Sequence, residues 1–227
     1  MTEEKIIISL GGSLIIPEEI DVNFLKDFRD LILIHVKQGK KFILITGGGK
    51  ICRKYDAAAK QIVSASSDEL DWLGIYSTRF NAEFVRLLFG EYADKDIIID
   101  PMLPMDFSKP IILGGGWKPG NSTDLVAVLI AHNVGAKQII NLSNTDYVYD
   151  SDPRINPKAK KIEKISWAEY RKIIPKEWNP GLNSPFDPIA SEMAEKDGIK
   201  VMTMNGKPID NLAKCLNGEK FAGTVIS

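Results

Sequence analysis

Glycines gather at three places where an apolar run gives way to a helical pattern. The segments SLGGS (9–13), TGGGK (46–50) and GGGWKPGNSTD (114–124) each follow such a run. Glycine permits a positive φ and gives a ligand close access to main-chain N–H groups, and a helix that starts nearby adds the positive end of its dipole. A single turn of this kind is explained by chain reversal alone. Three of them at corresponding strand ends predict a site for phosphate groups.

The spacing of these glycines differs from that of two familiar phosphate loops. The sequence contains no G-x-x-x-x-G-K-[ST], and no G-x-G-x-x-G stands between an expected strand and helix. A P-loop fold and a dinucleotide-binding Rossmann fold are therefore disfavoured.

The elements that must position the glycines alternate along the chain. Continuous apolar runs, typical of strands covered on both faces, occupy 5–10, 41–46, 110–115 and 137–142. One helical pattern starts after a plausible N-cap at Asp21. Further helical patterns occupy 50–62, 68–89, 123–133, 167–174, 187–196 and 207–216. This alternation predicts a three-layer α/β/α sandwich with a mainly parallel central sheet. The polar stretch 147–164 interrupts it and is expected to be an exposed hairpin or loop.

Composition and charge narrow the class of protein. The 227 residues include 29 Lys and Arg against 30 Asp and Glu, so the formal net charge of −1 implies no general attraction to nucleic acid or membrane. Cys52 and Cys215 lie far apart, and with His35 and His132 they form no metal-ligand pattern. The short apolar start resembles no signal peptide, and no run reaches the roughly 20 residues of a membrane span. We expect a cytoplasmic protein with one domain, 1–227.

Several motifs give a more specific indication. SLGGSLIIPEEID, ITGGGKICRKYD, LDWLGIYSTRFNA, KPGNSTDLVAVLIA, SNTDYVYDSDPRINPKAKKI and FDPIASEMAEKDGIKV occur in the order found in the amino acid kinase superfamily. The chain most resembles the archaeal-type uridylate (UMP) kinase branch of that superfamily, over nearly its whole length. The resemblance implies the amino acid kinase, or carbamate kinase-like, fold. It also implies an acceptor lobe over 1–135 and an ATP lobe over 136–227.

The resemblance implies which residues meet the acceptor, UMP. Gly48 would hold its phosphate, and Asp71 would accept hydrogen bonds from its ribose hydroxyls. The remaining expected UMP-binding residues are Trp117, Lys118, Pro119, Gly120, Asn121, Ser122 and Thr123. Without the resemblance, Asp71 would be explained as a charge on the surface of a helix.

The ATP side is implied in the same way. Gly12, Ser13, Gly49 and Arg53 would face its phosphates, and an arginine fork suits phosphate oxygens. The expected nucleoside contacts are Ser143, Asn144, Tyr149 and Asp152. A tyrosine can lie against adenine, although a packed strand residue is an alternative explanation of Tyr149.

The implied reaction transfers the γ-phosphoryl group of ATP, with Mg²⁺, to the phosphate of UMP. A phosphate oxygen is already a nucleophile, so catalysis is alignment and charge neutralisation. The expected catalytic residues are Gly12, Ser13, Arg53 and Asp124. An acid in the first turn of a helix, such as Asp124, is equally explained by the helix dipole. The resemblance further implies a homohexamer built from dimers.

The chain departs from its relatives at several positions. Ser9 and Asn144 stand where many relatives have lysines, which leaves Arg53, Lys50 and Lys118 as candidate cations. Tyr147, Trp117 and the segment 177–188 also differ from the usual pattern. Two alternatives to a UMP kinase follow: a non-catalytic nucleotide-binding or storage protein of the same fold, and a kinase for another small phosphate or carboxylate.

Overall fold

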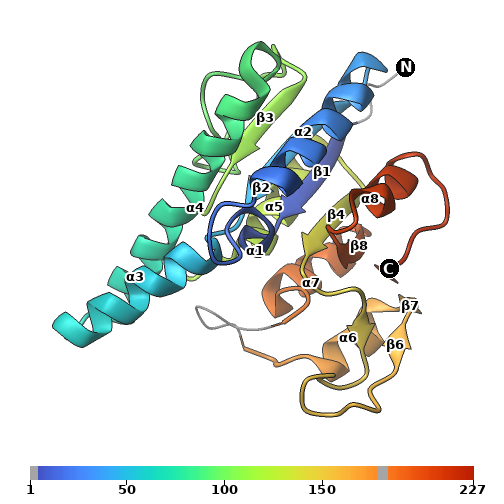
Figure 1. Ribbon diagram of the computed structural model, residues 1–227. Coiled ribbons are helices and arrows are strands. Elements are labelled where there is room, and N and C mark those ends of the chain that lie inside the picture. The colour runs from blue at the N-terminus through green and yellow to red at the C-terminus, as the bar shows by residue number, and fades with distance from the viewer. Residues whose placement is uncertain (1–4, 178–183) are drawn as a thin grey trace.

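A single seven-stranded sheet forms the centre of the molecule (Figure 1). The computed structural model describes residues 5–177 and 184–227. Within them the sheet has the order β3-β2-β1-β4-β8-β9-β7. The strands are β1 (Lys5–Leu10), β2 (Lys41–Thr46), β3 (Ile111–Gly114), β4 (Gln138–Ser143), β7 (Lys164–Ile165), β8 (Lys200–Asn205) and β9 (Thr224–Ile226). All neighbours pair in parallel except β8 and β9, which are antiparallel.

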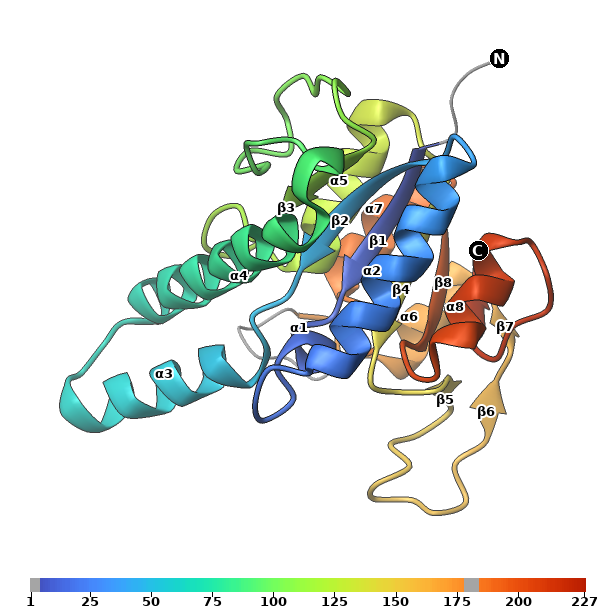
Figure 2. The ribbon, with the colours of Figure 1, turned by 45° about the horizontal axis from the view of Figure 1, so that its top comes forward.

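Helices cover both faces of this sheet (Figures 1 and 2). They are α1 (Gly12–Ile15), α2 (Val22–Lys37), α3 (Gly49–Ile62), α4 (Ser67–Phe89), α5 (Thr123–Val134), α6 (Trp167–Ile173), α7 (Pro188–Lys196) and α8 (Ile209–Leu216), with a 3-10 turn at Gly90–Tyr92. A small antiparallel hairpin of β5 (Val148–Tyr149) and β6 (Lys161–Ile162) projects from the sheet. The expected three-layer fold is thereby confirmed.

Alternate residues of each strand point into two separate cores. Ile8, Leu44 and Ile140 pack with α2, α4 and α8, whereas Ile7 and Ile43 pack with α5, α6 and α7. Successive side chains of a strand face opposite sides of a sheet, so a strand buried on both sides must be apolar throughout. This explains why the strands are continuous isoleucine-rich runs.

Most elements lie where the sequence predicts them. The four apolar runs are strands, Asp21 caps α2 by accepting from the N–H of Phe24 at 2.9 Å, and 147–164 contains the β5–β6 hairpin. The pattern did not single out α1, β8 or β9. Residues 178–183 of the unusual segment 177–188 lie outside the described residues.

The strand order sets the position of a site. From β1 the chain adds β2 and β3 on one side and then returns to place β4 on the other side of β1. In open parallel sheets ligands bind beyond the carboxyl ends of the strands at such a reversal. The three glycine segments follow β1, β2 and β3, so all lie at this edge. None of the described helices is long and apolar enough to cross a membrane.

Candidate active site

The first two glycine turns are packed directly against one another. A Cβ placed on Gly12 would lie 2.0 Å from the amide nitrogen of Gly49 and 2.6 Å from the carbonyl carbon of Gly47. Gly49 also has a φ of +69°, in the left-handed region that favours glycine. Only bare backbone fits between these turns, so the strand ends of β1 and β2 form one continuous main-chain surface.

Hydrogen bonds join this surface to the next strand. The N–H of Gly47 donates to the carbonyl of Leu10 in β1 at 2.9 Å. The N–H of Gly11 donates to the carbonyl of Leu142 in β4 at 2.8 Å. Ser143 ends β4, so the loop after β4 starts beside the first glycine turn. The reversal between β1 and β4 therefore places two loops next to each other.

Helix α4 links the third glycine turn to the second. Thr78 accepts from the N–H of Gly116 with its hydroxyl at 2.6 Å, and its carbonyl accepts from the hydroxyl of Thr46 at 2.9 Å. Asn81 donates from its amide to the carbonyl of Gly47 at 2.7 Å. One face of α4 thus holds the turns after both β2 and β3.

Asp71, near the start of α4, contacts the expected acceptor loop, residues 117–123. Its carboxylate accepts from the N–H of Gly120 at 2.7 Å, and burial raises its pKa above the usual value despite that hydrogen bond. Ser122 caps α5 by accepting from the N–H of Leu125 at 3.1 Å. The acceptor loop is therefore held at one end by α4 and at the other by α5.

Asp124 lies in the first turn of α5, against the end of β1. Its carboxylate accepts from the hydroxyl of Ser9 at 3.2 Å and from the N–H of Asp187 at 3.2 Å. Burial, together with the neighbouring Asp187 carboxylate, raises the pKa of Asp124 to about 7. Ser9 is thus a direct neighbour of this acid.

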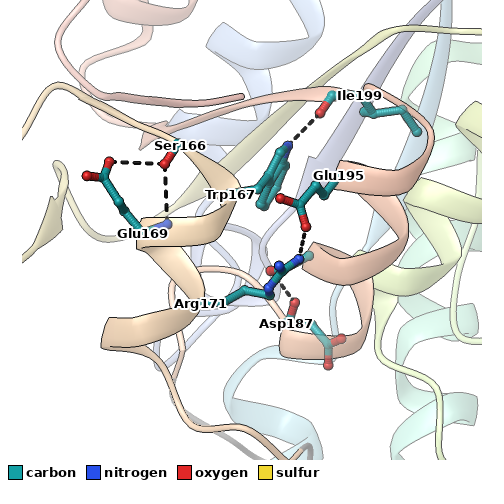
Figure 3. A network of polar contacts seen from close by, with 8 residues as sticks. Ser166, Trp167, Glu169, Arg171, Asp187, Glu195 and Ile199 are labelled. Carbon is teal, nitrogen blue, oxygen red and sulfur yellow. Dashed lines mark hydrogen bonds and ion pairs between the residues drawn. The ribbon is translucent and has the colours of Figure 1, made fainter.

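Asp187 is held in place by contacts between α6 and α7. Its carboxylate caps α7 by accepting from the N–H of Ala190 at 2.6 Å, and burial raises its pKa. In Figure 3, Arg171 reaches from α6 to Glu195 of α7, and the indole of Trp167 donates to the carbonyl of Ile199 at 3.0 Å. These contacts hold the end of α7 against α6. At the start of α7, the hydroxyl of Tyr170 in α6 accepts from the N–H of Phe186 at 2.7 Å, which fixes the residue before Asp187.

A cavity of about 530 Å³ opens on the other side of the β1–β4 reversal. Its wall combines polar residues of the loop after β4 with the β5–β6 hairpin and apolar residues that follow α6. The four expected ATP contacts all line it: Ser143, Asn144, Tyr149 and Asp152. Cavities of this size and mixed lining are typical of sites for small ligands.

Two charged groups of this cavity, Asp152 and Arg154, form an ion pair. Arg154 donates to the carboxylate of Asp152 at 2.6 Å, and this pairing lowers the pKa of Asp152 to about 2. Tyr147 also lines the cavity and packs edge-on against Tyr149 with ring centroids 6.5 Å apart. Tyr147 is therefore part of the wall of the cavity itself.

The three candidate cations have different surroundings. Lys50 forms an ion pair with Glu18 at 2.6 Å, and the ammonium of Lys118 lies 3.9 Å from the ring centroid of Trp117. Arg53 is exposed, one turn after the glycine that begins α3. The charge of Lys50 is thus offset by a carboxylate.

The carboxyl ends of β1, β2, β3 and β4 thus carry most of the expected site residues. Gly12, Gly48, Gly49, the acceptor loop and Asp124 follow β1, β2 and β3, and the ATP contacts follow β4. The assignment of individual residues to ATP or UMP stays a prediction. No group of three or more His, Cys, Asp or Glu side chains suited to a metal ion occurs among residues 5–177 and 184–227. Mg²⁺ commonly uses one or two carboxylates together with substrate phosphates, for which Asp124 and Asp187 are suited.

Sequence reasoning did not single out several residues that organise these loops. Thr78, Arg79 and Asn81 belong to the motif LDWLGIYSTRFNA, but the sequence indicates no role for them individually. Asp187 is predicted only as the first residue of a helix. Arg154 was likewise part of a motif without a role. The contacts of Thr78, Arg79 and Asn81 with the glycine turns join residues 32 or more positions apart, so no local pattern could reveal them.

Comparisons with known proteins agree with this architecture. Uridylate kinases of Thermococcus kodakarensis and Pyrococcus abyssi are 32% and 33% identical to this chain over 225 residues, which cover 98% of this chain and 99% of each relative. The crystal structure of uridylate kinase from Archaeoglobus fulgidus matches with a TM-score of 0.84 at 32% identity, covering 98% of this chain and 100% of the other.

A more distant structure shows the fold alone. The UMP kinase of Bacillus anthracis matches with a TM-score of 0.76 at 20% identity, covering 99% of this chain and 96% of the other. The family model described as the amino acid kinase family matches residues 4–205. The chain belongs to the amino acid kinase family.

Proposed function

We propose that this protein transfers the γ-phosphoryl group of ATP to UMP, giving UDP and ADP. One observation carries the proposal: the glycine turns after β1 and β2 form one main-chain surface, with the acceptor loop and a 530 Å³ cavity following the neighbouring strands. Two phosphorylated molecules can face each other across such a surface. The full-length relatives named uridylate kinase supply the identity of the two molecules.

The residues divide into an acceptor side and a donor side. On the acceptor side Gly48, Asp71 and the acceptor loop bind UMP; on the donor side Ser143, Asn144, Tyr149 and Asp152 bind the nucleoside of ATP. Gly12, Ser13, Gly49 and Arg53 meet the phosphates between them. Residues 1–135 thus form the acceptor lobe and 136–227 the ATP lobe of a single domain.

Transfer requires alignment and charge neutralisation rather than a protein nucleophile. The phosphate oxygen of UMP attacks in line, and main-chain N–H groups with Arg53 offset the charge that spreads over the transferred group. Bound with ATP, Mg²⁺ would neutralise further charge on the phosphates. Asp124 accepts from the hydroxyl of Ser9 and from the N–H of Asp187, so it orients the groups between the end of β1 and the start of α7.

The proposal includes a cytoplasmic homohexamer built from dimers. Trp72, Tyr76 and Phe80 recur every four residues on α4 and are exposed, Phe80 by 74%. An exposed apolar stripe of this kind suits contact with another protein surface. A second copy of the chain is the partner that we propose, and the cytoplasm is where ATP and UMP are available together.

An acceptor screen tests the function. The protein is incubated with ATP, Mg²⁺ and each nucleoside monophosphate in turn, and nucleoside diphosphates are separated and quantified. We expect UDP from UMP, at a higher kcat/KM than any other acceptor gives. ATP binding without acceptor-dependent ADP release would instead identify a binding or storage protein, and turnover of another acceptor without UDP would reject UMP.

A further inference from the structure

Arg79 of α4 reaches across to the start of the acceptor loop. Its guanidinium donates from Nε to the carbonyl of Gly116 at 3.0 Å and from Nη2 to the carbonyl of Trp117 at 2.6 Å. The planar fork of a guanidinium matches two neighbouring acceptors, whereas a lysine ammonium offers no such fixed pair. Two consecutive peptide carbonyls are therefore held toward α4.

This contact also determines where the next N–H groups point. A trans peptide is planar, with its N–H and C=O on opposite sides. When the carbonyls of Gly116 and Trp117 face Arg79, the N–H groups of Trp117 and Lys118 face away from it. Neither N–H donates to another group within 5–177 or 184–227. Both are thus available to an acceptor's oxygen atoms, and the two carbonyls are turned away from an approaching anion.

Other contacts of α4 fix the loop on either side of this pair. Thr78 holds the N–H of Gly116 at 2.6 Å, and Asp71 holds the N–H of Gly120 at 2.7 Å. The guanidinium of Arg79 lies 6.0 Å from the ring of Trp72 and 5.9 Å from that of Tyr76. These rings confine its approach from the exposed side of the helix. Arg79 is therefore a partly buried group with a defined position.

We propose that Arg79 is a positioning residue for the acceptor: it sets the peptide planes of the acceptor loop and so determines the affinity for the nucleoside monophosphate. This inference rests on the proposed function for the identity of the acceptor. Arg79 does not itself touch the acceptor. The ATP cavity is lined by residues after β4 and in the β5–β6 hairpin, so the affinity for ATP is independent of Arg79.

Variants of two arginines on one helix test the proposal. Arg79→Met removes the fork, Arg79→Lys retains a charge without it, and Arg86→Met is the matched control, because Arg86 pairs with Glu83 at 2.7 Å on the same helix. We expect Arg79→Met to raise the KM for UMP by at least about tenfold, since two charged hydrogen bonds are lost. Arg79→Lys gives a smaller rise, while the KM for ATP and kcat change by less than about twofold. Arg86→Met behaves as the wild type.

An unchanged KM for UMP in Arg79→Met would overturn the inference, as would equal rises in the KM values for UMP and ATP. If the wild type does not phosphorylate UMP, amide hydrogen exchange decides the matter without any substrate. Faster exchange at Gly116 and Gly120 in both Arg79 variants, but not in Arg86→Met, supports the positioning role. Equal exchange in all three variants contradicts it, whatever the acceptor is.

Discussion

At the scale of single residues, the fold strongly alters the ionisation of Asp124. Burial beside Asp187 raises its pKa to about 7, so the folded protein retains a proton that the unfolded chain has already lost. The stability contributed by that proton is present below the usual pKa of an aspartate, near 4, and is lost as the pH rises through about 7. Stability should therefore fall across this window.

Asp124→Asn tests this coupling, because asparagine keeps the shape and cannot ionise. Relative to the variant, the wild type should lose up to about 4 kcal/mol of unfolding free energy between pH 4 and pH 7.5. Urea unfolding at a series of pH values measures the difference. Parallel stability profiles for the two proteins would contradict a raised pKa at Asp124.

Arg53 is predicted to act on the transferred phosphoryl group rather than on the fold. Arg53→Ala should lower kcat/KM at least about tenfold, as expected when a charged contact to phosphate is lost. Lys54→Ala is the control, because Lys54 is also exposed on α3 but lies one position further round the helix. Equal activity of the two variants would remove Arg53 from the mechanism.

Which site residues could be predicted from the sequence depended on whether their residue type and position, or only a family resemblance, pointed to them. The glycines predict a phosphate site through their residue type and their position after the strands alone. Asp71 and Asp124 could be named only through family resemblance, since a lone acid on a helix has no distinguishing local pattern. Asp187 and Arg79 gave no signal, because their roles arise from contacts with Asp124 and with Gly116 that exist only in the folded chain.

At the scale of elements, the contact between the turns after β1 and β2 predicts that a side chain at Gly12 destabilises the protein. Gly12→Ala would place a methyl group 2.0 Å from the amide nitrogen of Gly49, where only backbone could move. We expect a loss of about 3 kcal/mol or more in unfolding free energy, since overpacking of this kind strains the main chain. Activity should fall with it.

Gly74→Ala is the matched substitution. Gly74 lies inside α4, and its added Cβ would meet only the sulfur of Cys52, at 3.4 Å. Alanine is favoured over glycine in a helix by about 1 kcal/mol, so this variant should be as stable as the wild type or more stable. Chemical denaturation compares the two. A tolerated Gly12→Ala would mean that the two turns are not in contact.

The elements themselves were largely predictable because each has a strong pattern. Strands buried on both faces are apolar runs, and the helices between them carry clear caps such as Asp21 and Ser122. Some elements escaped prediction: α1 starts within a glycine pair, and β9 has three residues, too few for any periodicity. The six residues of β8 include Thr203, so they do not form a continuous apolar run. The register between strands could not be predicted from the sequence either, because parallel partners are joined by long connections.

At the scale of the whole molecule, the exposed stripe on α4 predicts self-association. Phe80→Glu places a charge in the stripe, so it should lower the mass of the particle in sedimentation experiments. Ile155→Glu is the control, because Ile155 is also exposed but lies in the loop between β5 and β6. A wild type that sediments as a single 25.2 kDa chain would contradict the proposed oligomer.

The sheet order is what brings the acceptor loop, the glycine surface and the cavity to one edge. Because β1 lies between β2 and β4, loops distant in sequence become neighbours on either side of the first glycine turn. We therefore propose that the acceptor and ATP approach from opposite sides, with their phosphates meeting at that turn. A site built from any one loop would not achieve this.

A crystal structure with UMP and a non-hydrolysable ATP analogue bound together tests that arrangement most directly. The account predicts the UMP phosphate at Gly48 with its nucleoside along the acceptor loop, the analogue's base in the cavity beside Tyr149, and its γ-phosphate over Gly12 facing UMP. UMP bound away from the acceptor loop, or two nucleotides whose phosphates do not meet at the glycine surface, would contradict it.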